Sequence, residues 1–133
     1  MDNQNTAVTP FNIADFEAKD TAWLDVQNIK DDGPLLVNGG AVRIELSSPG
    51  TREYLGAQHA IATAEQAKTF AALRNKPIKE TVETRIKDGS IKPIACTRTI
   101  ENFPVSAQEL FTNPKLGWIT AQVNTFLSDW SNF

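Results

Sequence analysis

The chain has 133 residues, 41% of them hydrophobic and 22% charged, which is the length and composition of one globular domain with a core of its own. A net charge of −3 and scattered basic residues give no electrostatic footprint for nucleic acid, so no nucleic-acid partner is expected. A single cysteine excludes an internal disulfide, and no apolar run reaches the roughly 20 residues that span a bilayer, so we expect a cytoplasmic protein with no membrane partner.

Residues 1–20 are polar, follow no sustained period and predict an N-terminal arm in front of the folded domain. Phe11, Ile13 and Phe16 are the side chains expected to anchor this arm. The first five residues have neither the basic nor the apolar region of a signal peptide, so none is expected. The whole chain, residues 1–133, is expected to form a single domain.

Residues 22–47 predict a small antiparallel β-meander of two or three strands. Its clearest strand is residues 41–46, where every second residue is apolar and an Arg and a Glu alternate with them. Residues 30–34 and 38–40 are rich in Asp, Asn, Gly and Pro, which are typical of turns between strands. A sheet of this size is marginal by itself, so we expect it to pack on helices.

Residues 48–133 predict a mainly helical body of about four helices. Ser48 as N-cap and Pro49 as the first helical residue favour a helix that runs to about Leu73. One stripe of this helix is rich in alanine, which lets a neighbouring element approach closely. The stripe consists of Tyr54, Ala57, Ile61, Ala64, Lys68 and Ala71.

The middle segment, residues 78–103, carries mixed signals. Apolar residues spaced four apart, from Ile78 to Ile86, favour a short helix, although the β-branched residues among them leave a strand open. Residues 88–90 have the sequence Asp-Gly-Ser and predict a break. Residues 91–102 are then expected to be helical.

The C-terminal segment has clearer signals. The Ser-x-x-Glu sequence from Ser106 to Glu109 is a capping box that opens a short helix ending at Phe111. Pro114 then begins a last helix with apolar residues at i, i+3 and i+4. The stripe is Leu116, Ile119, Val123, Phe126, Leu127 and Trp130. The predicted fold class is therefore α+β, with an N-terminal meander packed on a helical body.

The residue types leave little room for catalysis or for metal and cofactor binding. His59 is the only histidine and Cys96 the only cysteine, which is too few for a nitrogen–sulfur metal site. A Cys96–His59 dyad remains formally possible, but apolar neighbours favour a buried role for the cysteine. Residues 38–40 lack the spacing of a phosphate-binding loop. We expect no catalytic, cofactor or metal site, and a protein that works by binding other proteins.

Aromatic residues near the C-terminus are the candidates for contact with a partner. Trp118 lies roughly 160–200° from the centre of the last apolar stripe at 100° per residue. Trp130 and Phe133 lie at the end of the sequence, and Phe111 ends the short helix before it. Trp and Phe are enriched at protein interfaces, because each buries a large area at a small entropic cost. The alternative is that the arm or the sheet covers Trp118, Trp130 and Phe133.

Several segments, in this order along the chain, carry a resemblance to a known family. They are the strand sequence 42–46, the helix start Thr51-Arg52-Glu53-Tyr54, Asn102-Phe103, the segment 106–110, Asn113-Pro114 and the closing sequence 126–133. Together they resemble the tail assembly chaperones of long, flexible-tailed bacteriophages over residues ~22–133. One departure lies at residues 99–103, where many relatives have a tryptophan and this chain has Phe103.

The resemblance implies a non-catalytic function in virion morphogenesis. Such a chaperone binds the tape measure protein and the tail tube protein in the host cytoplasm, keeps the tape measure soluble, and is absent from the mature virion. The family tends to self-associate, and many members also occur in a longer, frameshifted form, of which this chain would be the short counterpart. The alternative is a structural tail or head–tail connector protein that is retained in the virion.

Overall fold

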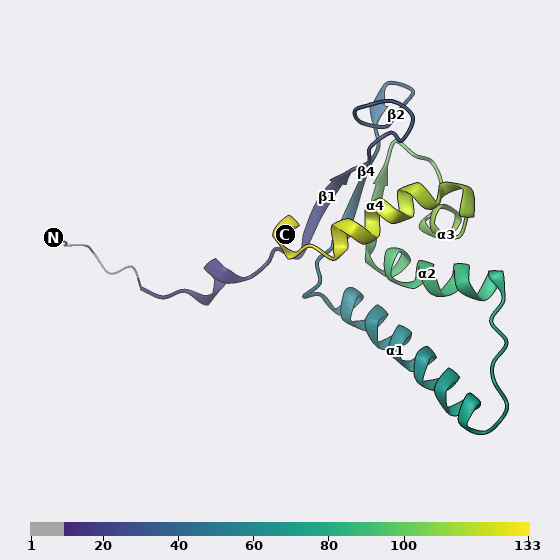
Figure 1. The fold of residues 1–133 in the computed structure, drawn as a ribbon. Coiled ribbons are helices and arrows are strands. Elements are labelled where there is room, and N and C mark those ends of the chain that lie inside the picture. Colours follow the sequence, from purple (N-terminus) through teal and green to yellow (C-terminus); the bar gives the residue numbers. More distant parts are fainter. Residues whose placement is uncertain (1–9) are drawn as a thin grey trace.

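The structure is a computed structural model that describes residues 10–133, so the first nine residues of the predicted arm lie outside the described part (Figure 1). Four α-helices and two small antiparallel sheets make up the described residues, and the predicted α+β class is confirmed. Among these residues no helix is both long enough and apolar enough to cross a bilayer.

The larger sheet has three antiparallel strands in the order β1-β4-β5. These are β1 (Thr21–Asp25), β4 (Arg43–Ser47) and β5 (Thr97–Glu101). A separate hairpin of β2 (Leu36–Val37) and β3 (Gly40–Ala41) joins β1 to β4. The third strand of the sheet thus comes from the middle of the chain, so the prediction of an entirely N-terminal meander is wrong in this respect.

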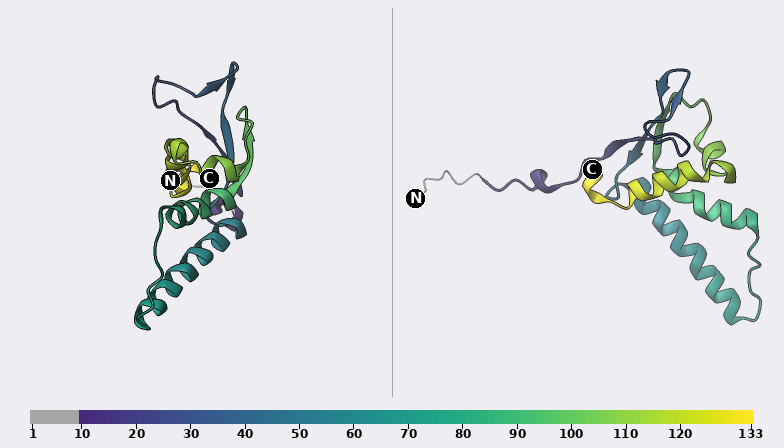
Figure 2. Two further views of the ribbon diagram at one scale, coloured as in Figure 1. Left: turned by 90° about the vertical axis from the view of Figure 1, so that its right-hand side faces the viewer. Right: turned by 45° about the horizontal axis from the view of Figure 1, so that its top comes forward.

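The alternation predicted for residues 41–46 is confirmed. Val42, Ile44 and Leu46 are buried, and the helices lie against this face of the sheet (Figure 2). The opposite face is polar: Arg43 lies over the ring of Trp23 at 4.4 Å and forms an ion pair of 2.9 Å with Glu101. A single side of the sheet therefore carries the core.

The first long helix, α1 (Arg52–Leu73), begins after Thr51 and not at the predicted Ser48. Thr51 Oγ1 accepts a hydrogen bond from the amide of Tyr54, as an N-cap does. The amide of Ser48 instead donates to the carbonyl of Asp20, next to the first strand, so Ser48 still belongs to the sheet. The predicted stripe is confirmed: Tyr54 and Ala57 are buried, and its other members are half-buried against α2.

The second helix, α2 (Val82–Cys96), contradicts the prediction for the middle segment. It begins after the N-cap Thr81, passes through residues 88–90 without the predicted break, and contains Pro93. The helix predicted for residues 91–102 is right only as far as Cys96, where the chain turns into β5. The β-branched residues of 97–101 pair with β4, and this long-range pairing outweighs the local helical pattern.

The C-terminal predictions are confirmed except at the end of the last helix, which stops at Leu127: Trp130, predicted on its apolar stripe, lies in a following 3-10 turn and is 59% exposed. Helix α3 (Ala107–Phe111) starts with a reciprocal capping box between Ser106 and Glu109. Pro114 opens a 3-10 turn that leads into α4 (Gly117–Leu127). The stripe of α4 places Ile119, Val123 and Leu127 in the core against the sheet. Helix α2 contacts α1 on one side and α3 and α4 on the other, so α1 is the outermost helix (Figure 1).

Candidate protein-binding surface

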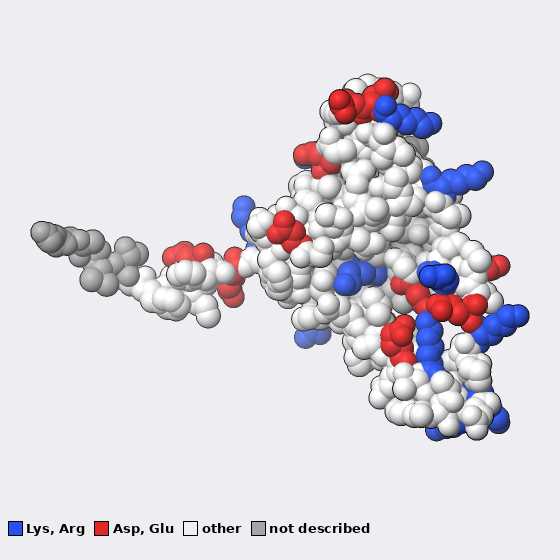
Figure 3. Space-filling model, in the orientation of Figure 1, with Lys and Arg blue, Asp and Glu red and all other residues white. Residues whose placement is uncertain are grey.

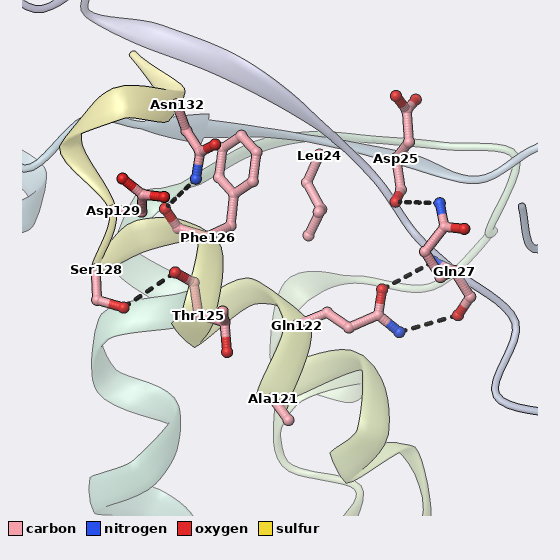
Figure 4. Close-up of a pocket in the computed structure, with 10 residues that line it drawn as sticks. All are labelled: Leu24, Asp25, Gln27, Ala121, Gln122, Thr125, Phe126, Ser128, Asp129 and Asn132. Carbon is pink, nitrogen blue, oxygen red and sulfur yellow. Dashed lines mark hydrogen bonds between the residues drawn. The ribbon is translucent and has the colours of Figure 1, made fainter.

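An open groove of about 570 Å³ runs between β1 and the C-terminal half of α4 (Figure 4). Leu24, Ala121 and Phe126 give it an apolar floor, and polar groups stand around its rim. The complete lining is Leu24, Asp25, Gln27, Ala121, Gln122, Thr125, Phe126, Ser128, Asp129 and Asn132. Because α4 turns Ile119, Val123 and Leu127 into the core, mostly small and polar residues of this helix line the groove together with Phe126.

One side-chain amide fixes the width of the groove at one end. Gln122 Oε1 accepts a hydrogen bond of 2.8 Å from the amide of Gln27, and Gln122 Nε2 donates one of 2.9 Å to the Gln27 carbonyl. The Gln122 side chain therefore occupies the place that a neighbouring strand would take beside residue 27. The two glutamines are 95 positions apart in sequence, so the pairing depends on the folded chain.

The end of the chain closes the other end of the groove. Asn132 Nδ2 donates to the carbonyl of Phe126 at 3.0 Å, and the ring of Phe133 meets that of Phe126 edge-on at 5.4 Å. Asp129 Oδ1 accepts hydrogen bonds from the amide and the hydroxyl of Ser131, at 3.0 and 2.6 Å. These hydrogen bonds hold the pKa of Asp129 below its usual value, so this wall of the groove is negatively charged at neutral pH.

The four aromatic candidates have different surroundings. Trp118 is half-buried against the core, although its helical angle predicted a free face, and Phe133 is half-buried beside Phe126. Phe111 is only 4% exposed and belongs to the core, so this fold does not present it to a partner. Trp130 is 59% exposed and borders a hollow beside the start of β1. Of the four, Trp130 is the one that is freely accessible.

The arm is not anchored by the side chains predicted to do so. Phe11 and Phe16 stack on each other at 5.5 Å, but they and Ile13 are 66–79% exposed. The arm extends away from the body (Figure 2) and is joined to it by a backbone hydrogen bond of 2.9 Å from the Lys19 amide to the Phe133 carbonyl. Large apolar side chains on the arm are therefore free to meet another molecule.

Charged residues gather where α1 and α2 face each other (Figure 3). Lys68 lies 3.4 Å from Glu65, 3.7 Å from Glu80 and 3.2 Å from Asp88. The hydrogen bond to Asp88, more than any other contact, raises the pKa of Lys68. Beyond this cluster several large apolar residues are exposed at the far end of the two helices: Phe70, Leu73, Ile78 and Val82.

The two residues of the possible catalytic dyad have unlike surroundings. Cys96 is fully buried, and burial raises the pKa of its thiol to about 11, so the thiol is protonated at neutral pH. His59 is exposed on α1. Within residues 10–133 no three His, Cys, Asp or Glu side chains converge in a way that could hold a metal ion.

Comparisons of the chain with protein-family models, with curated proteins and with solved structures found no match. The resemblance to the tail assembly chaperones consequently stays a prediction from the sequence.

Proposed function

We propose that the chain is a non-catalytic, protein-binding tail assembly chaperone of a long-tailed bacteriophage. Its partners are the tape measure protein and the tail tube protein, which it binds in the cytoplasm of the infected host, and it associates with copies of itself. Large apolar side chains are exposed on a fold whose helices α1, α2 and α3 have side-chain N-caps, and this exposure is the observation that supports protein binding. The resemblance of residues ~22–133 to the family supports the choice of partners.

The exposed residues fit a chaperone in their size and distribution. Phe16 on the arm, Leu73 at the end of α1 and Trp130 after α4 are all more than half exposed. Exposed apolar patches on a soluble protein mark sites of interaction, because burying them in a partner removes apolar surface from water. A chaperone needs such surfaces in order to cover the apolar surface of an aggregation-prone partner.

The test is co-expression with the tape measure protein that we expect to be encoded next to this chain. The soluble fraction of the tape measure should rise with the chain present and fall again with Trp130→Ala. The matched control is Ile29→Ala, because Ile29 is also 59% exposed but lies in the turn after β1. An equally insoluble tape measure with and without the chain would show that the proposal is wrong.

Mass spectrometry of purified virions distinguishes the chaperone from a structural tail or connector protein. We expect the chain to be absent from the particles. A stoichiometric amount in the particles would contradict the chaperone function and establish the structural alternative.

A further inference from the structure

Strand β1 lies at the edge of the three-stranded sheet. It pairs with β4 along one side, and no other strand within residues 10–133 pairs along its other side. An edge of this kind presents unpaired backbone N–H and C=O groups, which can pair with a strand from another chain.

The hydrogen bonds at both ends of β1 show which residues face outward. The amide of Ser48 donates to the carbonyl of Asp20, and the amide of Val26 donates to the carbonyl of Val42. Because backbone groups alternate in direction along an antiparallel strand, the even-numbered residues of β1 point their backbone groups toward β4. The odd-numbered residues Thr21, Trp23 and Asp25 therefore point their N–H and C=O groups toward the open side.

Both ends of this edge are already closed by the protein. Gln122 occupies both backbone groups of Gln27, and Gln27 Nε2 donates to the carbonyl of Asp25 at 3.1 Å. At the other end the amide of Lys19 is taken by the carbonyl of Phe133. Between these closures the outward groups of Thr21 and Trp23 and the amide of Asp25 remain available, along about 15 Å of chain at roughly 3.3 Å per residue. That length fits a short added strand.

The two sides of the edge differ in chemistry. Side chains of an added strand would alternate between the groove and the polar outer face. On the groove side they would meet Leu24 and Phe126, whereas the carboxylate of Asp25 points away from the groove (Figure 4). The edge therefore favours a segment in which every second side chain is apolar.

The charge of the edge indicates what the remaining side chains are. Within β1 only Asp25 is acidic, but the end of the arm that leads into the strand adds further acids, so residues 15–25 carry a net charge of −3, and Asp129 adds a carboxylate at the groove. Arg43, which pairs with Asp25 across the strands, forms an ion pair with Glu101 and lies over the Trp23 ring. The edge thus favours a basic occupant, and the acidic arm of a second copy carries the wrong charge.

We propose that the free edge of β1 binds an extended segment of a partner protein as an added strand, and that this segment alternates apolar and basic side chains. The inference rests on the proposed protein-binding function and specifies how one partner is held. Backbone hydrogen bonds supply affinity, the groove selects the apolar side chains, and the acidic residues select the basic ones.

The test is a titration of the full chain, followed by its amide NMR signals, with a short capped peptide that alternates valine and lysine. We expect saturable shifts at Thr21, Trp23 and Asp25. Methylating the backbone nitrogens that face β1 should weaken binding roughly tenfold, because hydrogen bonds are lost. Replacing lysine by glutamate should also weaken it. Equal binding of the methylated or the glutamate peptide, or shifts elsewhere, would overturn the inference.

Variants of the chain test the same edge from the protein side. Thr21→Pro removes an outward N–H while leaving the hydrogen bonds to β4. It should weaken the binding of the valine–lysine peptide several-fold. Asp25→Asn should weaken the same peptide, and the matched control Asp31→Asn in the following turn should not. An amide NMR spectrum that is otherwise unchanged shows that each variant is folded. Unchanged affinity in both edge variants would contradict the proposal.

Two further outcomes separate this inference from the proposed function. If the chain solubilises the tape measure protein but none of the peptides binds at β1, strand addition is wrong and the chaperone function stands. If signals of the β1 edge shift with protein concentration in the absence of peptide, a second copy is the occupant and the basic segment is wrong.

Discussion

The side chain of Asn102 packs closely against Gly40 beside the sheet. Asn102 has a positive φ of 63°, and its Nδ2 donates to the carbonyl of Ala41 at 2.7 Å. A Cβ added at Gly40 would lie 2.7–2.9 Å from the side-chain atoms of Asn102. Gly40→Ala should therefore displace this side chain and lower the free energy of unfolding by about 1–3 kcal/mol in urea titrations.

The same contact predicts that two substitutions are not additive. Asn102→Gly keeps the positive φ and removes the side chain that an alanine at 40 would strike. In the Asn102→Gly chain, Gly40→Ala should lower the free energy of unfolding much less than it does in the wild-type chain. An equal cost in both backgrounds would mean that the destabilisation comes from the backbone of Gly40 and not from the clash.

The buried thiol of Cys96 predicts a dependence of stability on pH. Its pKa is about 11 in the folded state and 9.0 for a solvent-exposed thiol, so the folded chain holds the proton more tightly. This difference contributes on the order of 2 kcal/mol to the free energy of unfolding. The contribution is present below about pH 9 and is lost as the pH rises toward 11. Urea titrations at increasing pH should show that the free energy of unfolding declines more steeply with pH for the wild type than for Cys96→Ala. Parallel curves would refute this.

At the scale of elements, α2 is the most informative case. Its interior Gly89 has open space around it, and an added Cβ would meet nothing within 4 Å. Gly89→Ala should raise the free energy of unfolding by about 0.5–1 kcal/mol, because alanine is the better helix former. Gly33→Ala is the matched control: its Cβ also meets nothing, but its φ of 107° disfavours alanine, so it should destabilise.

Elements with strong local signals were predictable from the sequence. The capping box at Ser106 and the stripe that includes Ile119 and Val123 each combine a start signal with a consistent period, and packing agrees with both. The predicted turn at Asn38-Gly39 is confirmed by φ values of 52° and 79°. In these places local preference and tertiary structure favour the same conformation.

The middle segment and the groove depend on distant residues. Gly89 and Ser90 favour a turn in isolation, yet they lie inside α2, where Ser90 is buried and its hydroxyl donates to the carbonyl of Lys87 at 2.8 Å. Strand β5 forms by pairing with β4, and this pairing joins residues more than 50 positions apart. The groove likewise needs Gln122 beside Gln27. No period in the sequence contains such pairings.

At the scale of the molecule, the burial of α1 decreases from one end to the other. Tyr54 and Ala57, near its start, are its only buried residues, and its later turns touch the body through α2. Few buried apolar contacts mean that local opening costs little free energy. Amides in the last turns of α1 should therefore exchange with solvent before those of α4, whose Ile119 and Val123 are buried in the core.

Lys68 makes the main polar contact between this outer end of α1 and α2, since it forms ion pairs with carboxylates of both helices. Lys68→Ala should speed exchange in the last turns of α1 and the first turns of α2, while amides in β4 keep their rates. Lys76→Ala is the matched control, because Lys76 is exposed just past α1 and has no ion pair among residues 10–133. Equal exchange in the two variants would show that apolar packing, and not the Lys68 cluster, holds the outer helix in place.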